Sequence, residues 1–147
     1  MTTDDDALLR VYNQELLALS AQAEKPIHLA EPDVMARAVS PICGSEVTVE
    51  LTLKNGRVAS FGYEVEACAL TRLVVAVMKK AIVGKTRQDI AQAGDELRGM
   101  LEGGPPPTGD WAGLKILIPV IEYKSRHDSI LLPFEATEKA FKEGSQP

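Results

Sequence analysis

The sequence predicts an α+β fold in which helices pack on one face of a three-stranded antiparallel sheet. Residues 46–54 alternate between apolar and polar side chains, which is typical of a half-buried strand. Asn55 and Gly56 follow directly, and this pair favours the type I′ turn of a hairpin. After the returning strand, apolar residues recur every three or four positions from Leu70 to Ala81, as on the buried face of a helix.

Three elements are expected before the hairpin. Residues 4–22 have the apolar spacing of an amphipathic helix, with a connector at 23–34 and a short first strand at 34–40. The apolar stripe of this helix consists of Leu8, Tyr12, Leu16 and Leu19, and Thr3 or Asp4 can cap its start. Pro26 and Pro32 break regular structure in the connector.

The returning strand is expected to run to Ala67 and to contain a bulge near Ala59 and Ser60, because Val58 is out of phase with the apolar positions that follow. The helix after it has the continuous stripe Leu70, Leu73, Val74, Val77, Met78 and Ala81. Gly84 is placed as the residue that ends this helix.

Three more helices are expected. Thr86 and Asp89 form a capping box for a helix that ends at Gly103, with Ile90, Leu97, Met100 and Leu101 facing inward. After an extended loop at 105–108, Asp110 caps a short helix that contains Trp111, Leu114 and Leu117 and is closed by Pro119. The last helix runs from Asp128 or Ser129 to Lys142, with Pro133 near its first turn and Ile130, Phe134, Thr137 and Phe141 as its packing side.

Length and composition predict one domain over residues 1–147, with an ordered core at about 4–143 and a short C-terminal tail. The net charge of −5 argues against a surface for nucleic acid or anionic membranes. The N-terminus lacks the apolar segment of a secretory signal, and the uncharged apolar runs at 73–78 and 116–121 are too short to cross a bilayer. A cytoplasmic location is therefore expected, and it favours free thiols over a disulfide. The oligomeric state stays open.

The two cysteines, Cys43 and Cys68, flank the predicted hairpin. Because a hairpin returns to its starting end, we expect both thiols to lie close together at one end of the sheet. Cys68 also begins a helix, where free backbone N–H groups and the helix dipole favour a thiolate, the form that binds metals. The competing interpretation is that both cysteines are small apolar fillers of the core, and spacing alone leaves both open.

The start of the last helix offers further ligands. His127 and Asp128 would add an imidazole and a carboxylate to the thiols, so the candidate metal ligands are Cys43, Cys68, Asp128 and His127. Two cysteines with His or Asp suit zinc or iron. A thiol enzyme with Cys68 as nucleophile and His127 as base is a further interpretation, although no oxyanion arrangement is visible. Arg126 is interpreted as a solvated surface charge, and His28 as a surface or connector histidine.

The motifs together resemble the iron–sulfur cluster assembly scaffold family of the IscU/SufU/NifU N-terminal domain type. Residues 41–45 (Pro-Ile-Cys-Gly-Ser) correspond to its Cys-Gly-Asp turn, and residues 63–70 are similar to its F-x-G-x-G-C-A-I motif. Residues 84–86 match its Gly-Lys-Thr, and residues 125–131 fall where it has a third cysteine. Here Ser45 replaces the aspartate, and Asp128 or Ser129 replaces the third cysteine, depending on the alignment.

The resemblance implies an IscU/NifU-like fold and a non-enzymatic scaffold that binds iron, zinc or a 2Fe–2S cluster through Cys43 and Cys68. It implies a cysteine desulfurase and other iron–sulfur assembly proteins as partners. The alternative is a degenerate scaffold that acts as an adaptor or sulfur-transfer partner of a desulfurase without holding a cluster, with a sulfur acceptor role for a thiol. The replaced ligands at Ser45 and at Asp128 or Ser129 motivate this alternative.

Overall fold

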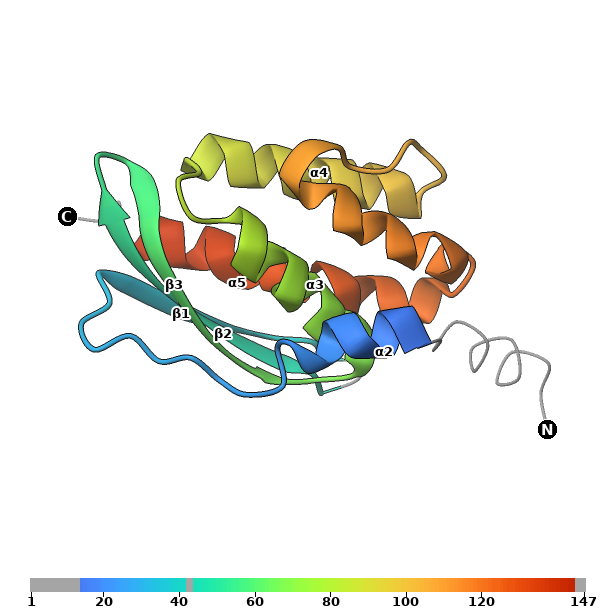
Figure 1. Ribbon diagram of the computed structural model, residues 1–147, viewed down its shortest axis with the longest axis horizontal. Helices are drawn as coiled ribbons and strands as arrows, with labels where there is room; N and C mark the ends of the chain where they lie inside the picture. Colours follow the sequence, from blue (N-terminus) through green and yellow to red (C-terminus); the bar gives the residue numbers. More distant parts are fainter. Residues whose placement is uncertain (1–13, 42–43, 145–147) are drawn as a thin grey trace.

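The computed structural model describes residues 14–41 and 44–144 and has the expected α+β architecture (Figure 1). Three strands form an antiparallel sheet in the order β1-β2-β3, with helices packed against one face. The strands are β1 (Val34–Val39), β2 (Glu46–Lys54) and β3 (Arg57–Glu66), and the helices are α2 (Gln14–Ala21), α3 (Ala69–Ala81), α4 (Arg87–Leu101), η1 (Gly109–Val120), η2 (Lys124–Arg126) and α5 (His127–Gly144). The fold class predicted from the sequence is confirmed.

The β2–β3 hairpin follows the predicted turn and bulge. Asn55 and Gly56 have φ values of 53° and 76°, as a type I′ turn requires. Thr52 pairs with Ser60 and Leu53 pairs with Val58, so Ala59 is the extra residue of a bulge. The bulge brings Val58 into phase with the buried face, where it is 1% exposed.

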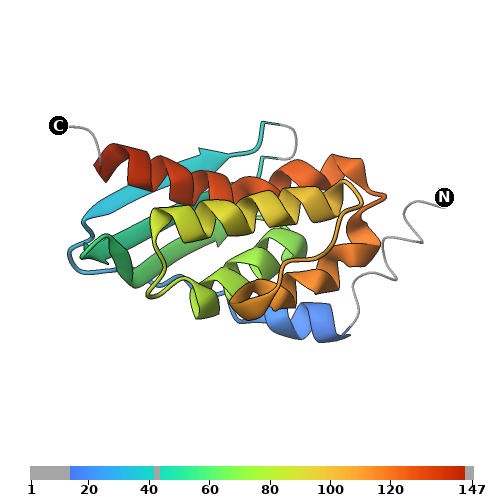
Figure 2. The ribbon, with the colours of Figure 1, turned by 90° about the horizontal axis from the view of Figure 1, so that it is seen from above.

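The helices form two layers over the sheet. α5 packs on β1 and β2, α3 packs on β3 and α5, and α4 and η1 cover α3 and α5 from outside (Figure 2). Every residue of the predicted stripe of α3 is buried, as are the predicted inward residues of α4 and α5. Leu16 of α2 is buried as expected, whereas Leu8, Tyr12 and the cap at Thr3 or Asp4 lie outside the described residues. Within the described ranges, no helix has the length and apolar character needed to cross a membrane.

Two helix ends differ from the prediction for tertiary reasons. α3 ends at Ala81 with Ile82 as its C-cap, because the N–H of Gly84 is donated to the carbonyl of Val58 in β3 at 2.8 Å. Asp110 does not cap η1, which begins after Thr108, and its carboxylate pairs with Lys85 at 2.7 Å. The capping box of Thr86 and Asp89 is present as predicted, and the N–H of Thr86 lowers the pKa of Asp89 by hydrogen bonding to its carboxylate.

α5 starts earlier than expected. It begins at His127, so Pro133 lies in its second turn rather than near the first. A proline there removes the N–H that would bind the carbonyl of Ser129, four residues earlier. The structure tolerates this loss because the hydroxyl of Thr71 in α3 donates to that carbonyl at 3.0 Å.

The connector between α2 and β1 is held against the sheet as a strap, which we define as residues 25–33. Ile27 forms two backbone hydrogen bonds with Tyr63 at the free edge of β3, at 3.0 and 2.7 Å. The next residues cross the outer face, where the N–H of Leu29 is donated to the buried carboxylate of Glu50 at 2.8 Å. The sequence identified a connector but not this attachment.

His28 of the strap is a surface residue, as predicted, but it is not isolated. Its Nδ1 lies 2.9 Å from Glu50 and its Nε2 lies 3.4 Å from Glu64. The hydrogen bond to Glu50 is the main reason why the pKa of His28 is raised above 6.5, with smaller contributions from the charges of both carboxylates.

We therefore expect the strap to be held more firmly at low than at high pH. A raised folded-state pKa contributes stability that is fully present below the unfolded value of 6.5 and is lost as the pH rises through the folded value. An NMR titration should place the His28 midpoint above 6.5. Glu50→Gln should lower the midpoint more than Glu64→Gln does. A wild-type midpoint at or below the ordinary value would contradict the expectation.

Candidate functional site

A small pocket opens at the end of the sheet where β3 passes into α3. It has a volume of about 230 Å³ and brings together the turn before β2, the strand–helix junction and the residue before α5. Its lining residues are Gly44, Ser45, Glu66, Ala67, Cys68 and Arg126. This is the end of the sheet at which the sequence predicted a site.

Cys68 occupies the junction itself. It is the N-cap of α3, with an extended backbone at φ −70° and ψ 171°, and its side chain makes no capping hydrogen bond. The thiol is free and half-buried, and its sulfur lies 3.7 Å from the hydroxyl of Thr71. β3 ends at Glu66 and α3 begins at Ala69, so Cys68 lies at the N-terminus of the helix, where it lines the pocket.

Cys43 lies outside the described residues, and the predicted proximity of the two thiols therefore stays a prediction. The residues around it are placed. The N–H of Gly44 is donated to the carbonyl of Ser40 at 2.9 Å, and the N–H of Ser40 to the carbonyl of Ser45 at 2.8 Å. These bonds join Ser40 to Gly44 and Ser45, and Gly44 has the positive φ of 72° that favours glycine.

The candidate ligands His127 and Asp128 are the first two residues of α5. Nε2 of His127 donates to the carbonyl of Ile121 at 2.9 Å, and Asp128 is exposed. Neither residue lines the pocket of Cys68. Within residues 14–41 and 44–144, no group of three or more His, Cys, Asp or Glu side chains could hold a metal ion. The described residues also do not pair Cys68 with His127, as the thiol-enzyme interpretation would require.

Arg126 is the pocket residue that the sequence analysis missed. It was interpreted as a solvated charge, but it is only half-exposed and lines the pocket beside Cys68. Its guanidinium is permanently charged, and the pocket lining therefore includes one basic residue, Arg126, and one acidic residue, Glu66. The signal that was available is its place in the segment 125–131, which falls where the family of the resemblance has its third cysteine.

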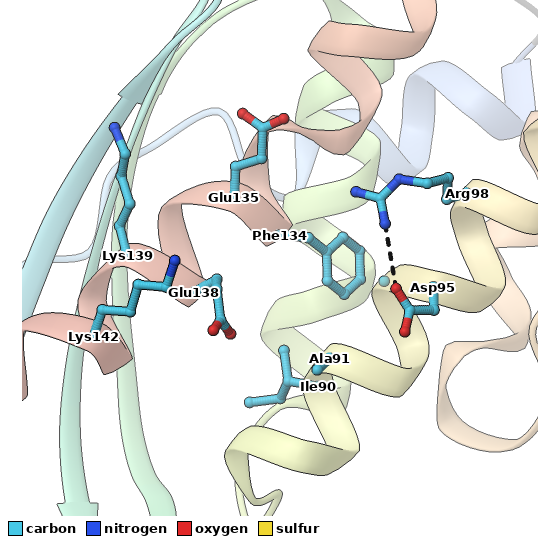
Figure 3. Close-up of a pocket in the computed structure, with 10 residues that line it drawn as sticks. Ile90, Ala91, Asp95, Arg98, Phe134, Glu135, Glu138, Lys139 and Lys142 are labelled. Carbon is cyan, nitrogen blue, oxygen red and sulfur yellow. Dashed lines mark hydrogen bonds and ion pairs between the residues drawn. The ribbon is translucent and has the colours of Figure 1, made fainter. Parts of the chain in front are cut away.

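A second, larger hollow lies between α4 and α5 and has a volume of about 440 Å³ (Figure 3). Its floor is already packed: Phe134 and Ile90 are 8% and 3% exposed, and the ring of Phe134 covers Gly94. Its rim has charges of both signs, including the ion pair of Arg98 and Asp95 at 3.2 Å. No thiol lines this groove.

Fold and pocket together define a class of small α+β proteins that present a thiol from a strand–helix junction at the open end of a three-stranded sheet. The structure of a nitrogen-fixing NifU-like protein (N-terminal) from Brucella abortus is similar, with a TM-score of 0.87 and 38% identity over 93% of this chain and 96% of that one. The chain belongs to the IscU/SufU/NifU family of iron–sulfur cluster assembly scaffold proteins.

Two further proteins are similar at lower sequence identity. The iron–sulfur cluster assembly scaffold protein IscU of Thermotoga maritima is 20% identical over 93% of this chain and 96% of its own length. The structure of a putative SUF-system scaffold protein from Fervidobacterium islandicum has a TM-score of 0.80 and 21% identity, over 89% of this chain and 96% of that one. No family model matches the sequence.

Proposed function

We propose that this protein is an iron–sulfur cluster assembly scaffold that holds iron, zinc or a 2Fe–2S cluster as cargo through Cys43 and Cys68. The observation that carries the proposal is the free thiol of Cys68 at an open pocket shared by three segments of the chain. The names of the relatives support the same role. A reducing cytoplasm would keep both thiols available, and the partners would be a cysteine desulfurase and other assembly proteins.

The donor set limits what the cargo can be. Iron–sulfur clusters are usually held by four cysteine or histidine ligands, whereas this chain has two cysteines in all. Asp128 and His127 are the remaining candidate donors, and His127 would first have to leave the carbonyl of Ile121. Two thiolates with a carboxylate or an imidazole match zinc or a ferrous ion better than a cluster held by one chain.

A second candidate function is that of an adaptor or sulfur-transfer partner of a desulfurase that holds no cluster. The observation that favours it is that Ser129, one of the residues at the position of the family's third cysteine, is buried and already hydrogen-bonded. Ser129 is 1% exposed and its hydroxyl is donated to the carbonyl of Arg126 at 3.1 Å, so this hydroxyl is committed to the backbone. In this role the chain itself catalyses no step, and one of its thiols accepts the outer sulfur of a cysteine persulfide on the partner, which is left with a free thiol.

The two functions are separated by elemental analysis of freshly purified, reduced protein and by anaerobic reconstitution with ferrous iron and sulfide. The scaffold function predicts bound zinc or iron, or a sulfur-to-iron charge-transfer absorbance. The adaptor function predicts neither, together with capture of a purified cysteine desulfurase that a Cys43→Ala/Cys68→Ala variant retains. Absence of both metal and desulfurase binding would overturn both functions.

A further inference from the structure

Arg126 differs from the other described arginines in the state of its side chain. Within residues 14–41 and 44–144, its guanidinium forms no hydrogen bond or ion pair, although its backbone N–H is donated to the carbonyl of Tyr123 at 2.9 Å. Every other arginine in these ranges binds a carboxylate or a backbone carbonyl; these are Arg37, Arg57, Arg72, Arg87 and Arg98. A guanidinium has five N–H donors, so Arg126 retains its full capacity to bind a ligand in the pocket that it lines.

The acidic residue of the same lining does not neutralise this charge. In the described chain, Glu66 forms no ion pair with Arg126, although both line the pocket. Glu66 is exposed whereas Arg126 is half-exposed, so water and salt screen the carboxylate more strongly than the guanidinium. The pocket should therefore favour an anion over a neutral group of the same size.

A persulfide is an anion that the sulfur-transfer role would bring to this pocket. The S–H of a persulfide is more acidic than that of an ordinary thiol, so its outer sulfur is negatively charged at neutral pH. The pocket has a volume of about 230 Å³ and is also lined by the free thiol of Cys68. It therefore has room for a small sulfur group next to the residue that would accept it.

From these observations we infer that Arg126 is a specificity-determining residue, which binds the anionic outer sulfur of a persulfide as this sulfur approaches Cys68. In the transfer, the S–S bond of the donor breaks and a new S–S bond forms at Cys68. Cys68–SH and R–S–SH give Cys68–S–SH and R–SH, so no oxidant or reductant is needed. The identity of the ligand as a persulfide rests on the proposed sulfur-transfer function, whereas the preference of the pocket for anions does not.

The test compares an anionic and a neutral reagent at the same sulfur. Iodoacetate and iodoacetamide alkylate Cys68 in the reduced, metal-free full chain, and mass spectrometry of the Cys68 peptide gives both rates. The ratio of the two rates cancels the reactivity of the thiol itself and reports the preference of the pocket for charge. Arg126→Gln should lower the iodoacetate-to-iodoacetamide ratio by about fivefold, the effect of one unit charge at contact distance in water. High salt should remove the difference from the wild type.

Three further variants separate a local charge from other causes. Arg126→Lys should keep most of the wild-type ratio, because lysine keeps the positive charge. Glu66→Gln should raise the ratio, because it removes the negative charge from the same lining. Arg98→Gln is the matched control: it makes the same change in net charge outside this lining, where Arg98 pairs with Asp95, and should leave the ratio unchanged.

Circular dichroism melting confirms that each variant is folded during labelling. An unchanged ratio in folded Arg126→Gln, or an equal loss in Arg98→Gln, would overturn the inference.

A second measurement identifies the anion. Glutathione persulfide serves as the donor, and the product at Cys68 is trapped with iodoacetamide and detected as a gain of one sulfur atom in the Cys68 peptide. Arg126→Gln should slow this transfer, relative to alkylation by iodoacetamide, by the same factor as it slows iodoacetate. A response to iodoacetate without a response to the persulfide would overturn the assignment of sulfur as the ligand.

These results are distinguishable from failure of the proposed function. The expected ratios in a chain that captures no cysteine desulfurase would support the anion site and remove the sulfur-transfer role. Desulfurase capture together with an unchanged ratio in Arg126→Gln would overturn the anion site and leave the sulfur-transfer role in place.

Discussion

Replacement of Cys68 by alanine is expected to lower the affinity of the reduced protein for zinc by more than about 100-fold. The loss of even an outer partner of a metal ligand costs about 10- to 100-fold, so the loss of one of the two thiolates should cost more. Competition with a chromophoric zinc chelator measures the change. Folding should be nearly unaffected, because the thiol is half-exposed and forms no disulfide.

Cys68→Ser is the control that separates ligation from packing. Serine keeps a small polar side chain at the junction, but its hydroxyl is a poor ligand beside a thiolate. Both variants should therefore lose zinc to a similar extent while their melting temperatures stay near that of the wild type. Retention of zinc by both would show that the metal is held elsewhere and would remove Cys68 from the site.

The parts of the fold that were predictable from the sequence are those with local causes. The turn at Asn55 needs two residues that tolerate positive φ, and the capping box at Thr86 needs only residues three positions apart. The burial of Leu73 and Met78 follows from helical period alone. Each of these signals depends on residues that are close together in the chain, so it can be recognised from the sequence alone.

The errors have long-range causes. The end of α3 depends on a hydrogen bond from Gly84 to Val58, and the second-turn position of Pro133 depends on Thr71, which is 58 residues away from the carbonyl that it serves. The same applies to the candidate site. Cys68 could be placed at the strand–helix junction from the local pattern, whereas no local sign in the sequence indicated that Arg126, just before α5, would line the pocket and that His127 would bind the carbonyl of Ile121 instead. Which residue near the start of a helix lines a pocket depends on how that helix packs against the rest of the protein. The local sequence does not determine this packing.

Substitution of Gly62 by alanine is expected to destabilise the protein by about 2–3 kcal/mol, because it combines overpacking with the loss of backbone hydrogen bonds. A Cβ at Gly62 would lie 2.7 Å from the carbonyl oxygen of Ile27 and 3.1 Å from the side chain of Leu29. The first of these atoms is backbone and belongs to the bridge between Ile27 and Tyr63, so it cannot move without breaking that bridge. The strap should therefore detach from β3.

Gly99→Ala in α4 provides the matched control for Gly62→Ala, since a Cβ at that position would meet no atom within 4 Å beyond its chain neighbours and the backbone of its own helix, and its φ is not positive. Alanine there should stabilise the helix by about 0.5–1 kcal/mol. Urea unfolding measures both changes, and amide exchange at Ile27 and Tyr63 should become faster in Gly62→Ala alone. The expectation would be contradicted if both variants had the same free energy of unfolding and the amides of Ile27 and Tyr63 stayed protected. The strap would then accommodate the added Cβ without loss of stability.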